Sequence, residues 1–180
     1  EAAELQKIMD REGKGEKLEA WDWWYYAEKL RQEKYDLNED AIKPYFSQED
    51  VHNGLCTVVN KLYGITLTPC DSISVYNKDV KTYIVKDADG SLLGVFYSDY
   101  MPRASKRSGA WMSNFREQQE GVRPLIYNVA SFTKPAGDLP SLLTIDEART
   151  MYHEFGHALH GLLTQCKYKG GSGPSVAQGF

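Results

Sequence analysis

The most informative absence from this sequence is a long apolar run. Nothing in its 180 residues approaches the roughly 20 consecutive apolar residues that a transmembrane helix needs. Residues 1–24 are charged throughout and lack the apolar core of a secretory signal. The sequence therefore predicts no membrane partner.

Cysteine is also scarce. The three cysteines, Cys56, Cys70 and Cys166, are odd in number, widely spaced and without a CxxC pair. This pattern is typical of free thiols in a reducing compartment. We therefore expect a cytoplasmic location.

Long basic runs are absent as well. The formal net charge is −4 and the pI is near 5.6. Proteins that bind nucleic acid concentrate Lys and Arg on one face to contact the phosphates. The charge balance therefore predicts no nucleic-acid partner.

Two features could still suggest nucleic-acid binding, which is the function that the sequence supports least. The run "WDWWYY" at 21–26 could stack on bases, but its flanking residues, such as Glu28, are acidic. The cluster Arg103, Lys106 and Arg107 could clamp an anion, but we interpret it as a solvated loop.

Three helices are predicted in the first third of the chain. The first covers about 18–35, with one side formed by Trp21, Trp24, Tyr25, Leu30 and Tyr35. A short helix follows in "LNEDAIKPYF", with Asn38 as its cap and Pro44 as its limit.

The third predicted helix lies in "SQEDVHNGLCTVVNKLYG", residues 47–64. Ser47 and Asp50 match a capping box at its start, and Gly64 is suited to its end.

The middle of the chain changes to a β pattern. Residues 80–100 form two β-rich runs around "DADG", which is a hairpin signal. A third β-rich run covers 123–132, and a loop is expected between them. The segment 141–166 then predicts a long helix from Ile145 to about Thr164, because Thr144 and Glu147 match a capping box. This order predicts an α+β fold with a small antiparallel sheet.

The long helix has two different sides. Its apolar arc contains Ile145, Ala148, Met151, Tyr152, Phe155, Ala158, Leu159, Leu162 and Leu163. His153, His157 and His160 fall within about 60° of one another on the opposite side. We therefore expect them to lie outside the core.

His153 and His157 are four residues apart, so their rings leave the helix one turn apart, about 6 Å along its axis. They can converge on one zinc ion, which binds imidazole at about 2.0–2.1 Å. Glu154 points to the side, where it could hold a zinc-bound water. In this H-E-x-x-H arrangement the glutamate accepts a proton from that water as it attacks a peptide carbonyl.

A catalytic zinc site has three protein ligands, and this sequence supplies two. We expect His160 to lie too far along the helix to be the third ligand. It should either pack against neighbouring residues or contact a zinc ligand without binding the zinc itself. Cys166 is expected to point away, and Glu147 to be solvated. The alternative is a polar helix side whose histidines bind nothing.

The motif "HEFGHALHGLL" resembles that of a family of zinc oligopeptidases that includes thimet oligopeptidase, neurolysin, oligopeptidase A and bacterial peptidyl-dipeptidase. Three other stretches are similar to that family in order and spacing: "WDWWYYAEKLRQEKYDLNEDAIKPYF", "VHNGLCTVVNKLYGITL" and "YMPRASKRSGAWM". The similarity runs from about residue 16 to at least residue 164.

The resemblance implies a mostly helical peptidase with a zincin-like core and a deep channel for short peptides. It implies that His153 and His157 bind zinc, that Glu154 is the general base, and that the third ligand is a glutamate just beyond Phe180. We expect residues 1–180 to be a single partial domain, the N-terminal part of the catalytic domain, truncated at both ends.

We interpret the chain as a fragment of a zinc metallopeptidase for short peptides that is inactive alone, because its third ligand is missing. The alternative is a non-enzymatic module that self-associates or binds a partner through exposed apolar surface.

Overall fold

The α+β fold class is confirmed in the computed structural model, which describes residues 1–180 except 14, 36–38, 136, 138 and 176–180. The proposed cap Asn38 lies outside the described residues. The chain divides into two units, Glu1–Ile42 and Lys43–Phe180, each with its own core.

The first unit contains the helices α1 (Ala2–Arg11), α2 (Trp23–Tyr35) and α3 (Glu39–Ile42). Its core is small because only one side of α1 meets α2. The buried residues are Leu5, Ile8, Met9 and Tyr26. Ion pairs also join the two helices: Arg11 with Glu33, Lys34 with Glu4, and Lys29 with Glu12.

The side of α2 predicted from its aromatic residues is wrong in part. Tyr26 is the buried aromatic residue, and Leu30 packs partly against it. Four of the predicted residues are exposed: Trp21, Trp24, Tyr25 and Tyr35. When aromatic residues follow one another, as in 21–26, a 3–4 spacing fits several sides of a helix, and contact with α1 decides which side is buried.

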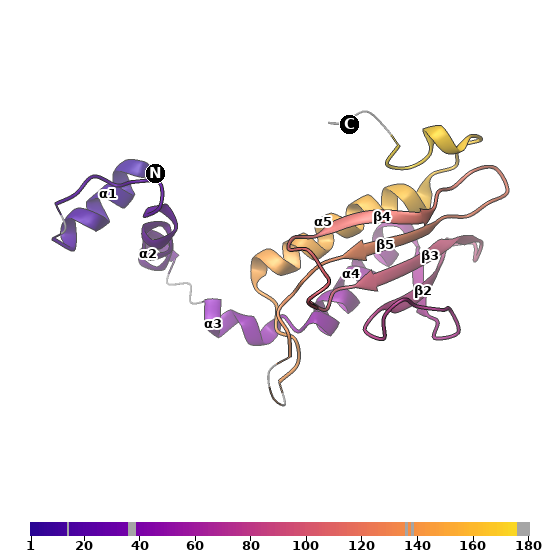
Figure 1. The fold of residues 1–180 in the computed structure, drawn as a ribbon, viewed down its shortest axis with the longest axis horizontal. Helices are drawn as coiled ribbons and strands as arrows, with labels where there is room; N and C mark the ends of the chain where they lie inside the picture. Colours follow the sequence, from indigo (N-terminus) through magenta and orange to yellow (C-terminus); the bar gives the residue numbers. More distant parts are fainter. Residues whose placement is uncertain (14, 36–38, 136, 138, 176–180) are drawn as a thin grey trace. The chain divides into compact units, whose positions relative to one another are not determined.

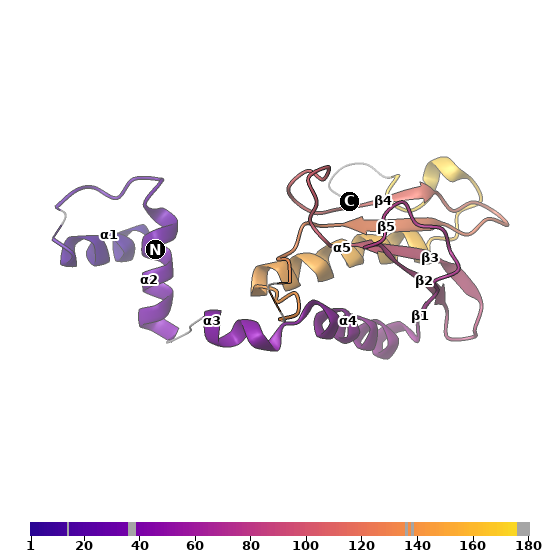
Figure 2. The same ribbon diagram turned by 60° about the horizontal axis from the view of Figure 1, so that its bottom comes forward.

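The second unit is built on a five-stranded sheet with the order β1-β2-β3-β5-β4. Its strands are β1 (Thr66–Pro69), β2 (Lys81–Lys86), β3 (Leu92–Asp99), β4 (Trp111–Arg116) and β5 (Leu125–Val129). The helices α4 (Gln48–Tyr63) and α5 (Ile145–Leu163) cover one face of this sheet (Figures 1 and 2). Two short 3₁₀ helices, Lys43–Tyr45 and Lys169–Gly171, complete the unit.

The predicted ends of α4 and the predicted start of α5 are confirmed. The Ser47 hydroxyl accepts a hydrogen bond from the Asp50 amide at 3.0 Å, and Gly64 ends α4 with a φ of 74°. At α5, the Thr144 hydroxyl accepts from the Glu147 amide at 3.1 Å, and the Glu147 carboxylate accepts from the Thr144 amide at 2.9 Å. This reciprocal capping box fixes where α5 begins.

The core of the second unit lies between the sheet and the two helices. The rings of Phe96 on β3 and Phe155 on α5 meet edge to face with centroids 5.0 Å apart. Gly161 is buried where α5 crosses β5, and a side chain there would clash with Ile126. A larger residue at position 161 would force the end of the Ile126 side chain to move, so glycine lets the helix lie close to the sheet with Ile126 in its present place.

The prediction of an antiparallel sheet is wrong for one pair of strands. β3 and β5 run parallel, while the other three pairs are antiparallel. β5 returns from the β4 hairpin and inserts between β3 and β4. The strand pattern of a sequence does not state which strands become neighbours, so this insertion is a property of the tertiary fold.

Two strands were also missed. β4 lies in the segment 103–121 that we expected to be a loop, and β1 follows α4 directly. β4 is short and stands at the edge of the sheet, where its side chains are half-buried or exposed, so it carries a weak hydrophobic pattern. In the described part of the chain, no helix is both long and apolar enough to cross a membrane.

The interpretation of Arg103 and Lys106 as part of a solvated loop is wrong. Both side chains form ion pairs with Asp99, and the Lys106 side chain is only 3% exposed. Arg107, the third member of the cluster, is exposed as expected.

The capping box of α5 generates a stability prediction. Thr144→Ala should lower the free energy of unfolding by about 1 kcal/mol, because the amide of Glu147 loses its acceptor. Urea unfolding followed by circular dichroism measures this change. The matched control is Thr57→Ala, which removes an exposed hydroxyl in the middle of α4 and should change stability by less than about 0.5 kcal/mol. Equal effects of both substitutions would contradict the assigned role of the cap.

Candidate metal and active site

The polar and apolar sides of α5 lie where the sequence predicts them. His153, His157 and His160 are exposed. The buried side consists of Ala148, Met151, Phe155, Ala158, Gly161 and Leu162. Only the edges of the predicted apolar arc differ, since Tyr152 and Leu163 are 40% and 38% exposed. Packing against the sheet therefore turns the histidines outward.

His153 and His157 form a close pair. Their Nε2 atoms are 3.2 Å apart, and the two rings are nearly perpendicular, with centroids 4.8 Å apart. Two imidazole nitrogens that bind one tetrahedral zinc at 2.0–2.1 Å would be separated by about 3.3 Å. The donor atoms are thus already at the separation that a zinc ion requires. A shared hydrogen bond between the two rings is compatible with the same distance.

No third ligand joins this pair within the part of the chain that the structure describes. His160 is exposed one turn further along α5, and its role stays a prediction. The Cys166 thiol donates a hydrogen bond to the Gly171 carbonyl at 2.9 Å, so this contact occupies it.

Glu147 is not the solvated residue that we expected. Its carboxylate completes the capping box with Thr144 and also accepts hydrogen bonds from the amide and hydroxyl of Thr133. The carboxylate therefore anchors the preceding loop to the start of α5, which leaves it unsuited to a metal.

Glu154 is half-buried and lines a cleft of about 1120 Å³ beside the histidine pair. His153 and Glu154 belong to one wall of this cleft, and Phe46 and Val51 belong to the wall near α4. Ala110, the residue before β4, also lines it. Glu154 therefore lies on the same cleft as His153, one member of the histidine pair.

Sequence reasoning missed two buried polar groups in the core of the second unit. The Tyr100 hydroxyl and the Asn128 amide are buried and lack a hydrogen-bond partner among the residues described. Burial raises the pKa of the Tyr100 hydroxyl, although the neighbouring Asn128 side chain acts in the opposite direction. Such unpaired buried groups are rare in proteins, and no sequence pattern marks them.

The fourth histidine lies apart from this pair, on α4. The His52 ring stacks at a tilt on Tyr83, with centroids 4.8 Å apart, and its Nε2 lies 3.6 Å from the Cys56 sulfur. Burial, helped by the charge of Lys81, lowers the pKa of His52 to about 4. His52 is therefore neutral at pH 7.

Comparisons with known proteins agree with the motif. Residues 1–180 match the sequence profile of Peptidase family M3. The chain is similar to the "Dipeptidyl carboxypeptidase" of Salmonella typhimurium, with 43% identity over 183 aligned residues, which cover 100% of this chain and 27% of that protein.

Two further relatives are more distant. "Oligopeptidase A" of Escherichia coli is 36% identical over 180 residues, covering 97% of this chain and 26% of that protein. "Organellar oligopeptidase A, chloroplastic/mitochondrial" of Arabidopsis thaliana is 39% identical over 174 residues, covering 90% and 22%. The chain thus spans about a quarter of the length of these curated relatives.

The lowered pKa of His52 predicts a pH dependence of stability. Between pH 6.5 and about 4 the unfolded chain binds a proton at this residue and the folded chain does not, so acid favours unfolding there. Protonation of His52 in the unfolded chain should therefore lower the free energy of unfolding by about 2–3 kcal/mol as the pH falls from 7 to 4. Urea unfolding of His52→Gln should show a correspondingly smaller loss over this range. The exposed His160→Gln is the matched control and should keep the full loss; a His52→Gln variant that does the same would contradict the assignment.

Proposed function

Because the chain belongs to peptidase family M3, a family of zinc metallopeptidases, we propose that it forms part of the catalytic region of such an enzyme. The observation that supports the site best is the 3.2 Å separation of the His153 and His157 Nε2 atoms on the exposed side of α5. We propose these two residues as zinc ligands and Glu154 as the general base.

The donor set fits zinc. Neutral imidazoles are preferred zinc ligands, and the pair is accessible from solvent. A zinc ion held there would act as a Lewis acid that polarises the peptide carbonyl and makes a water acidic near neutral pH. We propose that a third ligand, a glutamate, lies beyond Phe180.

Glu154 performs the proton transfers in this proposal. Its carboxylate accepts a proton from the water that attacks the carbonyl carbon, and it then delivers that proton to the amine that leaves when the C–N bond breaks. The half-buried place of Glu154 on the cleft supports this role, because one carboxylate oxygen can face the water while the ligand occupies the cleft.

We propose short peptides as the substrates. The names of the relatives, a dipeptidyl carboxypeptidase and an oligopeptidase, support this class. The zincin-like architecture, the cytoplasmic location and the assignment of residues 1–180 to one partial domain remain part of the same proposal. Because only two of the proposed zinc ligands belong to this chain, we expect it to bind zinc weakly and not to hydrolyse peptides by itself.

A second candidate function is a non-enzymatic module that self-associates. The exposed aromatic residues of the first unit favour it, since Trp21, Trp24 and Tyr35 are 70–82% exposed. Light scattering distinguishes the two proposals: self-association that disappears on replacing these residues by Gln supports the module, and a monomer at all concentrations excludes it.

The proposed ligands predict the zinc affinity. In a calorimetric zinc titration, the double variant His153→Ala, His157→Ala should bind at least tenfold more weakly than the unmodified chain, because both donor atoms are lost. His160→Ala, from the same exposed side of α5, is the matched control and should keep the affinity within about threefold. Equal affinity in the double variant would mean that zinc binds elsewhere.

The proposed base predicts the effect of replacing Glu154 in any form of the protein that hydrolyses peptides. Glu154→Gln should lower kcat by about 10²–10⁴-fold, because the amide cannot accept the proton. Zinc affinity should stay within about threefold, since Glu154 is not a ligand in this proposal. Hydrolysis of an internally quenched short peptide provides the measurement, and a kcat that the substitution leaves unchanged would exclude Glu154 as the base.

A further inference from the structure

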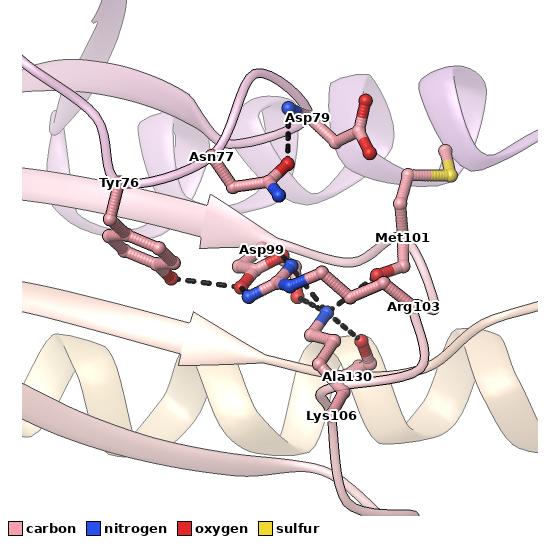
Figure 3. Close-up of polar contacts among 8 residues, drawn as sticks. All are labelled: Tyr76, Asn77, Asp79, Asp99, Met101, Arg103, Lys106 and Ala130. Carbon is pink, nitrogen blue, oxygen red and sulfur yellow. Dashed lines mark hydrogen bonds and ion pairs between the residues drawn. The ribbon is translucent and has the colours of Figure 1, made fainter.

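A buried ion cluster lies where β3 ends, and Asp99 is its centre (Figure 3). The Asp99 carboxylate accepts hydrogen bonds from both terminal nitrogens of Arg103 at 2.8 Å each and from the Tyr76 hydroxyl at 2.9 Å. Lys106 Nζ lies 2.9 Å from the same carboxylate. Burial alone would raise the pKa of Asp99, but these partners outweigh it and hold the pKa below its ordinary value.

Lys106 connects this carboxylate to the main chain of two neighbouring strands. Its ammonium donates hydrogen bonds to the carbonyls of Asp99 at 2.7 Å, Met101 at 2.8 Å and Ala130 at 2.5 Å. Asp99 ends β3, and Ala130 directly follows β5. One buried cation thus joins the ends of the two parallel strands to the loop that leads to β4, as Figure 3 shows.

This loop ends at the candidate active site. Ala110 follows Lys106 by four residues and lines the same cleft as His153 and Glu154. The next residue, Trp111, begins β4 and pairs with Val129, the neighbour of Ala130. The segment from Lys106 to Trp111 is therefore held at both ends by consecutive residues, Val129 at the end of β5 and Ala130 directly after it, which fixes the position of Ala110.

Stability alone is a poor explanation of this cluster. Removing three charged side chains from water is costly, and replacing a buried ion pair by apolar residues is often neutral or stabilising. The strand ends are also joined without Lys106, because the amides of Ala130 and Phe132 donate to the carbonyls of Asp99 and Tyr100. What Lys106 adds is a directional attachment of the loop to both strands.

We propose that Lys106, held by Asp99, is a positioning residue of the peptidase site: it fixes the loop before β4 so that Ala110 forms the cleft wall beside Glu154. This inference rests on the proposed function of the site. It assigns Lys106 an action through the loop and no contact with the reacting atoms.

Hydrogen–deuterium exchange of the chain tests the placement of the loop. Lys106→Met keeps the aliphatic stem and removes the cation, so amide exchange in 101–111 should rise at least tenfold while exchange in α5 stays unchanged. Lys106→Arg, which can still donate to several acceptors, should restore at least part of the protection. The matched control is Arg107→Met, which removes a charge from an exposed neighbour and should change neither segment.

Two outcomes of this comparison would overturn the proposal. One is unchanged exchange in 101–111; the other is an equal rise in α5, which would make the cluster a general stabiliser. If Lys106→Met does not fold, Asp99→Asn gives the same comparison, because it removes the charge that holds Lys106 and keeps the shape of the side chain.

Peptide hydrolysis tests the consequence in any form of the protein that is active. Lys106→Met should lower kcat about tenfold or more at unchanged zinc content, because a displaced wall misaligns the substrate, and Lys106→Arg should recover part of the rate. An unchanged kcat overturns the proposal. If a zinc-loaded form of the protein that also contains the third ligand is inactive, the proposed function fails, and the exchange experiment still decides whether Lys106 places the loop.

Discussion

The contact of α5 with the sheet is the constraint on which the rest of the structure depends. The edge-to-face contact of Phe96 with Phe155 and the close approach at Gly161 fix the rotation of the helix about its axis. A turn of about 100°, one residue of the helix, would bring polar side chains against the core. The burial of one side of α5 therefore determines that His153 and His157 face outward with their donor atoms close together.

The sheet contributes to the site through its edge. β5 inserts between β3 and β4, and the alanine directly before β4 lines the cleft. The parallel β3–β5 pair brings two strand ends together, and the buried ion cluster lies where these ends meet. The cleft wall thus depends on a long-range strand arrangement, whereas the histidine pair depends on one helix.

This difference explains what could be predicted from the sequence. The start of α5 follows from Thr144 and Glu147, and the exposed side of the helix follows from its periodicity, because both are local properties. The insertion of β5, the pairing of the edge strand β4 and the hydrogen bond from Lys106 to Ala130 join residues that are distant in sequence, and the local patterns of β4 and of the segment around Lys106 resemble those of loops. The exposed aromatic residues of α2 were misplaced because consecutive aromatics leave the helical phase ambiguous.

The central claim is that His153 and His157 together bind zinc, and X-ray absorption spectroscopy at the zinc edge tests it most directly. The zinc-loaded chain should show scattering from two imidazole rings with zinc–nitrogen distances of about 2.0–2.1 Å, and this scattering should vanish when both histidines are replaced by alanine. A spectrum without imidazole scattering, or one that the double replacement leaves unchanged, would contradict the account.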